Sequence, residues 1–140
     1  MSIRVLIADD TDIMREAMRK VIGEEPRIQV VGEASSFGQT MQAIADFTPD
    51  VLLLDLHMAE KGDFSPAPVK SQLASVGHIL AVSFSNDAEA RDLAEAYGAK
   101  LLLDKMKLFS DLVPAILECG PSADYFENPH VISEMSQPNQ

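Results

Sequence analysis

The chain has 140 residues, the size of one ordinary domain, and its 46% hydrophobic and 24% charged residues are typical of a globular protein rather than a disordered one. Its formal net charge is −11, and because nucleic-acid backbones are bound by clustered Lys and Arg, this charge predicts no direct DNA binding. A single cysteine, Cys119, excludes an intrachain disulfide, and the lack of a signal peptide or a membrane-length apolar run predicts a cytoplasmic protein without membrane contact.

Five apolar segments of strand length recur along the chain. They span residues 3–8, 28–32, 51–54, 78–82 and 100–103. Several are nearly continuous hydrophobic runs, which is typical of parallel strands covered on both faces.

The segments between these strands have helical spacing. The first predicts a helix with one buried stripe, made of Ile13, Met14, Ala17, Met18, Val21 and Ile22. Asn86, with Glu89 three residues later, resembles a capping box at the start of a helix that runs to Tyr97 and stops at Gly98. The last helix is ended by Gly120-Pro121 and has an apolar face made of Leu108, Leu112, Val113 and Ile116.

The region after the third strand departs from this regularity. Gly62, Pro66 and Pro68 predict that the third helix is short and starts near Ala67. From Pro121 onward the pattern stops, so we expect one domain over residues 1–120 and a C-terminal tail or linker stub over 121–140. Five strands that alternate with five helices predict an α/β fold with a doubly wound parallel sheet.

Polar residues follow the strands at the edge where open α/β sheets bind ligands. Asp9 and Asp10 end the first strand, Asp55 the third and Ser83 the fourth, and Lys105 follows the fifth. Three neighbouring carboxylates repel one another unless a hard cation lies between them, and Mg²⁺ prefers oxygen ligands. Such a site would suit Asp55 as a nucleophile toward a phosphoryl group whose oxygens contact Lys105 and Ser83.

Together these segments resemble the response regulator receiver family over residues 1 to about 119. The matching pieces are Val5–Asp10, Pro49–Met58, Ala81–Ser83, Gly98–Ala99 and Asp104–Lys105. The resemblance implies a five-stranded, flavodoxin-like sheet of order 2-1-3-4-5 with helices on both faces. It also implies that Asp55 is the phosphoacceptor of a receiver domain.

The same resemblance implies a cofactor and partners. Mg²⁺ would be bound directly by Asp10 and Asp55, by Asp9 through water, and by the backbone carbonyl of His57. The phosphoryl donor would be a histidine kinase or a histidine phosphotransfer protein in a two-component phosphorelay, and the downstream partner a protein that the sequence does not identify. No enzymatic activity is expected beyond self-phosphorylation and self-dephosphorylation.

Three residues depart from the family pattern. Ala59 replaces a usual proline, Phe84 a usual small residue, and Leu102 the usual aromatic switch. Phe84 is expected either to restrict access to Asp55 or to pack outward against the helix that follows it. The side chain of His57 either positions or excludes a hydrolytic water, or is a bystander.

These departures leave an alternative open, a receiver-like interaction module that works with little or no phosphorylation. An aspartate-based acid phosphatase is less favoured, because His57 stands where that class usually has a second acid. A dinucleotide-binding fold is less favoured still, because the chain contains no Gly-x-Gly-x-x-Gly segment.

Overall fold

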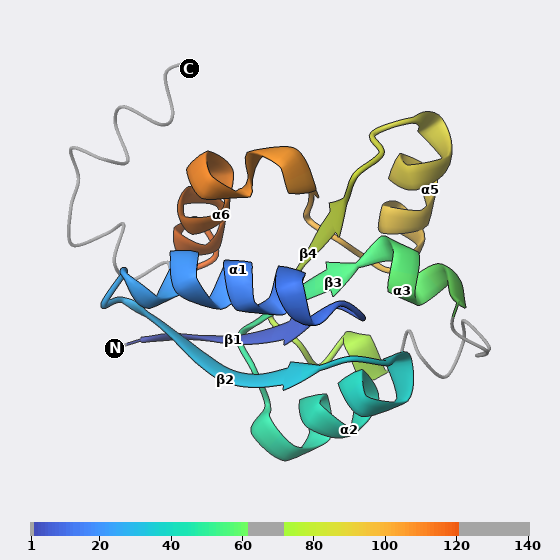
Figure 1. The fold of residues 1–140 in the computed structure, drawn as a ribbon. Coiled ribbons are helices and arrows are strands. Elements are labelled where there is room, and N and C mark those ends of the chain that lie inside the picture. The colour runs from blue at the N-terminus through green and yellow to red at the C-terminus, as the bar shows by residue number, and fades with distance from the viewer. Residues whose placement is uncertain (1, 62–71, 121–140) are drawn as a thin grey trace, which may run out of the picture.

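The computed structural model describes residues 2–61 and 72–120, in which five parallel strands form one sheet with helices on both faces (Figure 1). The strands are β1 (Ile3–Ala8), β2 (Ile28–Ala34), β3 (Val51–Asp55), β4 (His78–Ser83) and β5 (Leu101–Asp104). Their order is β2-β1-β3-β4-β5, which confirms the predicted fold class and strand order. The helices are α1 (Asp12–Gly23), α2 (Phe37–Phe47), α3 (Leu56–Lys61), α5 (Ala88–Ala96) and α6 (Leu108–Leu117), with a 3₁₀ turn η1 (Lys105–Lys107).

The continuous apolar runs form central strands because side chains on both sheet faces are buried. Along β1, Val5 and Ile7 enter one core, whereas Leu6 and Ala8 enter the other. The same alternation places Leu53 of β3 in the first core. Successive side chains of a strand point to opposite faces, so each strand of the sheet's middle contributes to two cores at once.

The first core lies between the sheet and helices α1 and α6, which Figure 1 shows on the same side of the sheet. Met18 and Ile22 from α1 pack there with Leu112 and Ile116 from α6. Cys119 is a free, buried cysteine of this core. The second face is covered by α2, α3 and α5, whose buried residues contact Leu6, Leu54 and Ala81 among others.

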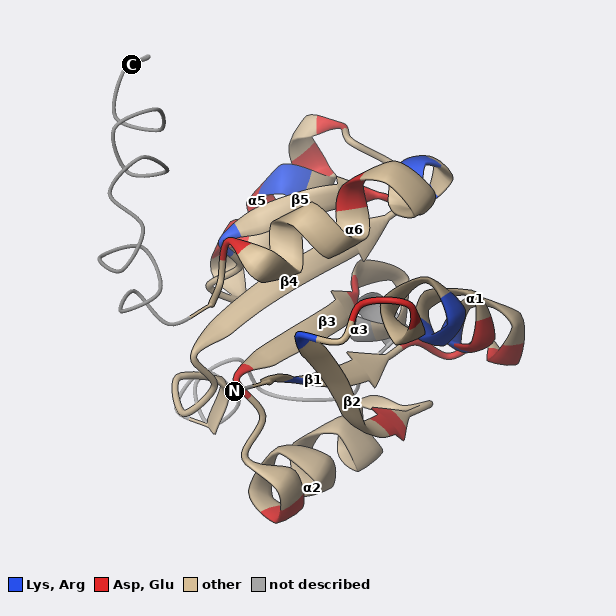
Figure 2. Cartoon of the chain, turned by 90° about the vertical axis from the view of Figure 1, so that its left-hand side faces the viewer, with Lys and Arg blue, Asp and Glu red and all other residues tan. Residues whose placement is uncertain are grey.

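The basic residues of α1 are paired with acidic ones, and Figure 2 shows its blue stretch beside red ones. Arg19 Nη1 lies 2.5 Å from Glu33 Oε2 on β2, and Lys20 Nζ lies 3.4 Å from Glu16 Oε2 one turn away. The first pair joins α1 to β2, and the second lies within α1. None of the helices in residues 2–61 and 72–120 has the length and apolar character needed to cross a membrane.

Two helix starts differ from the sequence prediction. The N-cap of α5 is Asp87, whose carboxylate accepts a hydrogen bond from the Ala90 amide at 2.8 Å, and not Asn86. Asp and Asn cap helices about equally well, so the sequence did not determine which of these two adjacent residues is the N-cap. The predicted stop at Gly98 is confirmed by its positive φ of 80°.

The second difference is α3, which begins directly after β3 and which the sequence analysis did not predict. The helix start predicted near Ala67 lies outside the described residues, as does the tail predicted over 121–140.

Candidate functional site

The carboxyl ends of β1, β3 and β5 bring three charged side chains into contact. Lys105 Nζ lies 2.8 Å from Asp9 Oδ2 and 3.1 Å from Asp55 Oδ1. Asp9 follows β1, Asp55 ends β3, and Lys105 follows β5, so residues far apart in sequence meet because their parallel strands end at one edge. The sequence analysis selected all three, and the structure places them together.

Burial decides the electrostatics of this charged cluster, defined by Asp9, Asp55 and Lys105. Asp9 and Asp55 are 0% and 1% exposed. Burial raises the pKa of the Asp55 carboxyl, the charge of Asp9 raises it further, and Lys105 offsets only part of this effect. For Lys105, burial alone would lower the pKa of the ammonium, but the two carboxylates outweigh burial and raise it. The lysine therefore stays charged beside a carboxylate made more basic by its surroundings.

Thr11 and Arg15 hold Asp9 in place, and the sequence analysis missed both. The amide and hydroxyl of Thr11 each donate a hydrogen bond of 2.9 Å to Asp9 Oδ1. Arg15 Nη1 donates to the Asp9 carbonyl at 2.7 Å. An Asp with Thr two residues later is a frequent local hydrogen-bonding pattern, so the Thr11 contact had a sequence signal, whereas the Arg15 contact needed the fold.

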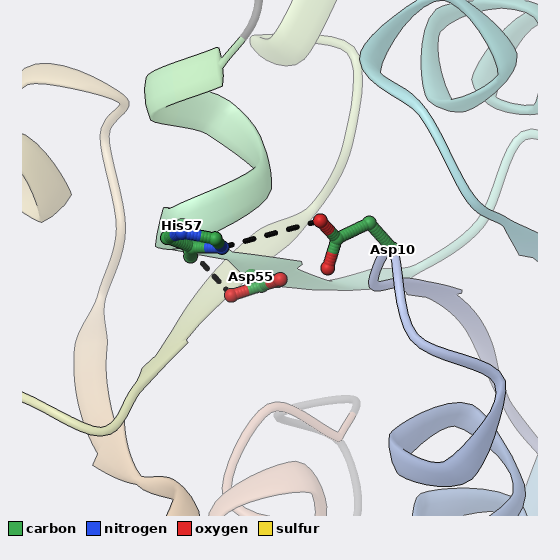
Figure 3. A group of neighbouring side chains, drawn as sticks. All are labelled: Asp10, Asp55 and His57. Atoms are coloured by element: carbon green, nitrogen blue, oxygen red, sulfur yellow. Dashed lines mark hydrogen bonds and ion pairs between the residues drawn. The ribbon is translucent and has the colours of Figure 1, made fainter.

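Asp10, Asp55 and His57 form a second group, drawn in Figure 3. One ligand atom from each lies within 4.8 Å of the others, and His57 Nδ1 is 4.0 Å from Asp10 Oδ2. The backbone amide of His57 donates to Asp55 Oδ1 at 3.1 Å.

The second oxygen of Asp55 supplies the test of whether these residues suit a cation. Asp55 Oδ2 is buried and has no hydrogen-bond partner among the described residues. A buried carboxylate oxygen without a partner is costly, and a bound cation satisfies it. The residues present therefore fit a divalent ion such as Mg²⁺, with Asp10 and Asp55 as oxygen donors.

Ser83 and Phe84 lie at the same edge of the sheet. Ser83 is half-buried at the end of β4, beside Asp104 in the strand register, and its Oγ accepts a hydrogen bond from the Ser85 amide at 3.0 Å. The ring centroid of Phe84 lies 5.1 Å from Lys105 Nζ, although 64% of Phe84 is exposed. Of the two sequence interpretations, the ring position favours Phe84 over the site rather than packed outward on α5.

Leu102, at the position of the usual aromatic switch, packs on the face of the sheet that α5 covers. It is partly buried against a cluster that contains Leu56 after β3, Ala81 of β4 and Ala90 of α5. Leu102 is therefore one of the apolar side chains packed between β5 and α5.

Comparison with known proteins identifies one family. The response regulator receiver domain matches residues 5–117. The response regulator protein VraR of Staphylococcus aureus is 26% identical over 136 residues, which cover 96% of this chain and 64% of VraR. The signal receiver domain of NarL from Mycobacterium tuberculosis superposes with a TM-score of 0.73 at 26% identity, covering 84% of this chain and 95% of that domain.

These neighbours correct one prediction. The curated relatives include the transcriptional regulatory protein LiaR of Bacillus subtilis, which is 30% identical over 106 residues that cover 75% of this chain and 50% of LiaR. The prediction of no direct DNA binding is therefore wrong. It was drawn from the net charge of 140 residues, yet the chain spans 31% and 64% of the first curated relatives, so its charge says little about their partners.

Proposed function

The chain belongs to the response regulator receiver domain family, and on that premise we propose that it accepts a phosphoryl group on Asp55 in two-component signal transduction. The donor is a phosphohistidine of a histidine kinase or of a histidine phosphotransfer protein. One observation carries the proposal: Asp55 is a buried carboxylate with Lys105 at one oxygen and no hydrogen-bond partner, among the described residues, at the other.

In the proposed transfer, a carboxylate oxygen of Asp55 attacks the phosphorus of the donor. A P–O bond forms, the P–N bond to the donor imidazole breaks, and that imidazole takes up a proton. Lys105 neutralises the phosphoryl oxygens, and the hydroxyl of Ser83 donates a hydrogen bond to one of them. Mg²⁺ held by Asp10 and Asp55 would supply further neutralisation of charge on the phosphoryl oxygens.

Asp9 has a supporting part in this proposal. Its Oδ1 already accepts two hydrogen bonds from Thr11, and its Oδ2 lies beside Lys105. Both oxygens lie against protein groups, although Oδ2, like Oδ2 of Asp55, has no hydrogen bond among the described residues. This placement supports contact with the ion through water rather than direct ligation. Its fixed position in turn holds the ammonium of Lys105 at the site.

The proposed receiver unit spans residues 1–120, with a tail or linker stub over 121–140. The family match that ends at residue 117 supports this boundary, as does the end of α6 at Leu117.

Exposed apolar side chains support docking of a protein donor near the site. Ile13 on α1 and Phe109 on α6 are 79% and 84% exposed and line a recess of about 300 Å³ together with Ala17. Large apolar side chains on the surface mark contact with partners. A cytoplasmic location suits this exchange, and the downstream partner is a protein or DNA.

Phosphoryl transfer is tested with acetyl phosphate and Mg²⁺, using intact-protein mass spectrometry. We expect the wild-type chain to gain one phosphoryl group and Asp55→Asn to gain none. Asp46→Asn, which alters an exposed aspartate on α2, is the matched control and should label like the wild type. A folded wild-type chain that gains no adduct would refute the proposal and favour the interaction module, whose support is Leu102 at the switch position and Phe84 over Lys105.

A further inference from the structure

The position of His57 in α3 changes what this residue can offer a cation. Because α3 begins at Leu56, His57 is the second residue of the helix. Its backbone amide donates to Asp55 Oδ1 at 3.1 Å, and its imidazole Nδ1 lies 4.0 Å from Asp10 Oδ2. The imidazole, and not only the main chain, is therefore at the site.

The distances within this group suit one shared ion. Nitrogen and oxygen ligands bind a first-row divalent cation at about 2.0–2.2 Å, so two ligands of one ion lie up to about twice that distance apart. The ligand atoms of Asp10, Asp55 and His57 are within 4.8 Å of one another, which is slightly beyond this limit. Small side-chain rotations of the exposed imidazole would bring them into range.

The buried oxygen of Asp55 is independent evidence for a ligand at this point. Lys105 and the His57 amide both contact Oδ1 of Asp55, and neither contacts Oδ2. In Figure 3 the dashed line from His57 reaches one oxygen of Asp55, and the other is drawn on the Asp10 side. An ion pair between His57 and Asp10 alone would leave this buried oxygen without a partner.

We propose that the imidazole of His57 is a third side-chain ligand in a divalent-cation site with Asp10 and Asp55. The inference deepens the proposed function, since it assigns a ligand to the same site, but it concerns metal choice rather than phosphoryl transfer. Sites made only of carboxylate, carbonyl and water favour Mg²⁺, whereas imidazole suits transition ions such as Ni²⁺. The chain should therefore bind Ni²⁺ with an affinity that its carboxylates alone cannot provide.

Isothermal titration calorimetry on the untagged chain, with Ni²⁺ and Mg²⁺ titrated separately, tests the assignment. His57→Ala removes the imidazole but keeps the backbone carbonyl, so it separates the two ways in which this residue could bind an ion. We expect Ni²⁺ affinity to fall at least about tenfold and Mg²⁺ affinity to change by less than about twofold. Circular dichroism verifies that the variant is folded.

Two further variants locate the effect. His78→Ala alters a half-buried histidine at the start of β4 and should leave Ni²⁺ affinity unchanged. Asp10→Asn should weaken both ions, because it removes a shared oxygen ligand. The inference is overturned if His57→Ala binds Ni²⁺ as tightly as the wild type, or if His78→Ala causes the same loss.

These outcomes are distinguishable from failure of the proposed function. If His57→Ala binds Ni²⁺ as tightly as the wild type and Asp55 is still labelled in the presence of Mg²⁺, only the proposal of an imidazole ligand is refuted. If His57→Ala loses Ni²⁺ affinity but the wild-type chain is never labelled, the imidazole ligand is supported and the proposal that Asp55 accepts a phosphoryl group is refuted.

Discussion

The apolar core beneath α1 and α6 and the charged cluster of Asp9, Asp55 and Lys105 draw on the same strands, but different forces act on them. In the core, Ile7 and Leu53 are completely buried, and each such side chain stabilises the fold by roughly 1.5–3 kcal/mol. In the charged cluster, each carboxylate depends on Lys105, because a buried charge without a partner is costly. The contrast indicates that the core holds the fold, whereas the cluster is retained for its chemistry.

The largest expected effect comes from removing the one cation of the cluster. Lys105→Met leaves Asp9 and Asp55 buried without their shared partner, and we expect the free energy of unfolding to fall by about 3–5 kcal/mol. Urea denaturation at pH 7 measures the change. Lys107→Met removes an exposed lysine two residues away and should stay within about 0.5 kcal/mol of the wild type. Equal losses in the two variants would show that the cluster does not depend on its cation.

A core substitution tests the other half of the comparison. Leu112 on α6 is completely buried, so Leu112→Ala should lower the free energy of unfolding by about 3 kcal/mol through lost burial and a residual cavity. Phe109→Ala, on the same helix but 84% exposed, should change it by less than about 0.5 kcal/mol. The same denaturation experiment applies. Unlike Lys105→Met, this loss should be independent of pH, since no charge is involved.

The predictability of these two regions from sequence also differed. The core was predictable because continuous apolar runs such as Val51–Leu54 form buried parallel strands in almost any α/β context. The charged cluster was predictable from residues at strand ends, together with the receiver resemblance that supplied the strand order. Spacing alone could not have shown that Lys105 reaches both Asp9 and Asp55.

Side-chain placement and local helix starts were not predictable. The position of Phe84 over Lys105 depends on a rotamer, and sequence spacing left both of its orientations open. The start of α3 at Leu56 depends on how the chain leaves β3, where apolar residues fit a strand or a helix equally well. The choice of Asp87 over Asn86 as the cap of α5 likewise rests on backbone geometry.

Asp55 itself should be a source of instability. Burial and Asp9 raise the pKa of its carboxyl, so ionising this group costs more free energy in the fold than in the unfolded chain. Asp55→Asn should therefore raise the free energy of unfolding at pH 7 by about 1 kcal/mol. The measurement is paired urea denaturation of wild type and variant across pH.

The pH dependence has a definite sign. A carboxyl whose pKa is higher in the folded state stabilises the fold below its ordinary pKa of 3.8, and this stabilisation is lost as the pH rises through the raised value. The advantage of Asp55→Asn should thus grow from acidic to neutral pH. An advantage that stays constant over this range would mean that the ionisation of Asp55 carries no cost.

Phe84 combines features of the apolar core and of the charged cluster, because its apolar ring lies over the charged group of Lys105. One face of the ring lies over Lys105, and cation–π contacts at exposed sites contribute about 0.5–1 kcal/mol. Phe84→Ala should lower the free energy of unfolding by this small amount. It should also speed acetyl-phosphate labelling of Asp55, because the side chain above the site is removed.

Phe84→Leu separates the bulk of the ring from its aromatic face. Leucine keeps most of the volume but offers no π system, so the variant should lose stability like alanine and yet label nearly as slowly as the wild type. Labelling as fast as in Phe84→Ala would mean that the ring acts by holding the ammonium of Lys105, not by restricting access. Labelling rates that are the same in all three proteins would mean that Phe84 has no part in controlling the site, and that its contact with Lys105 belongs to stability alone.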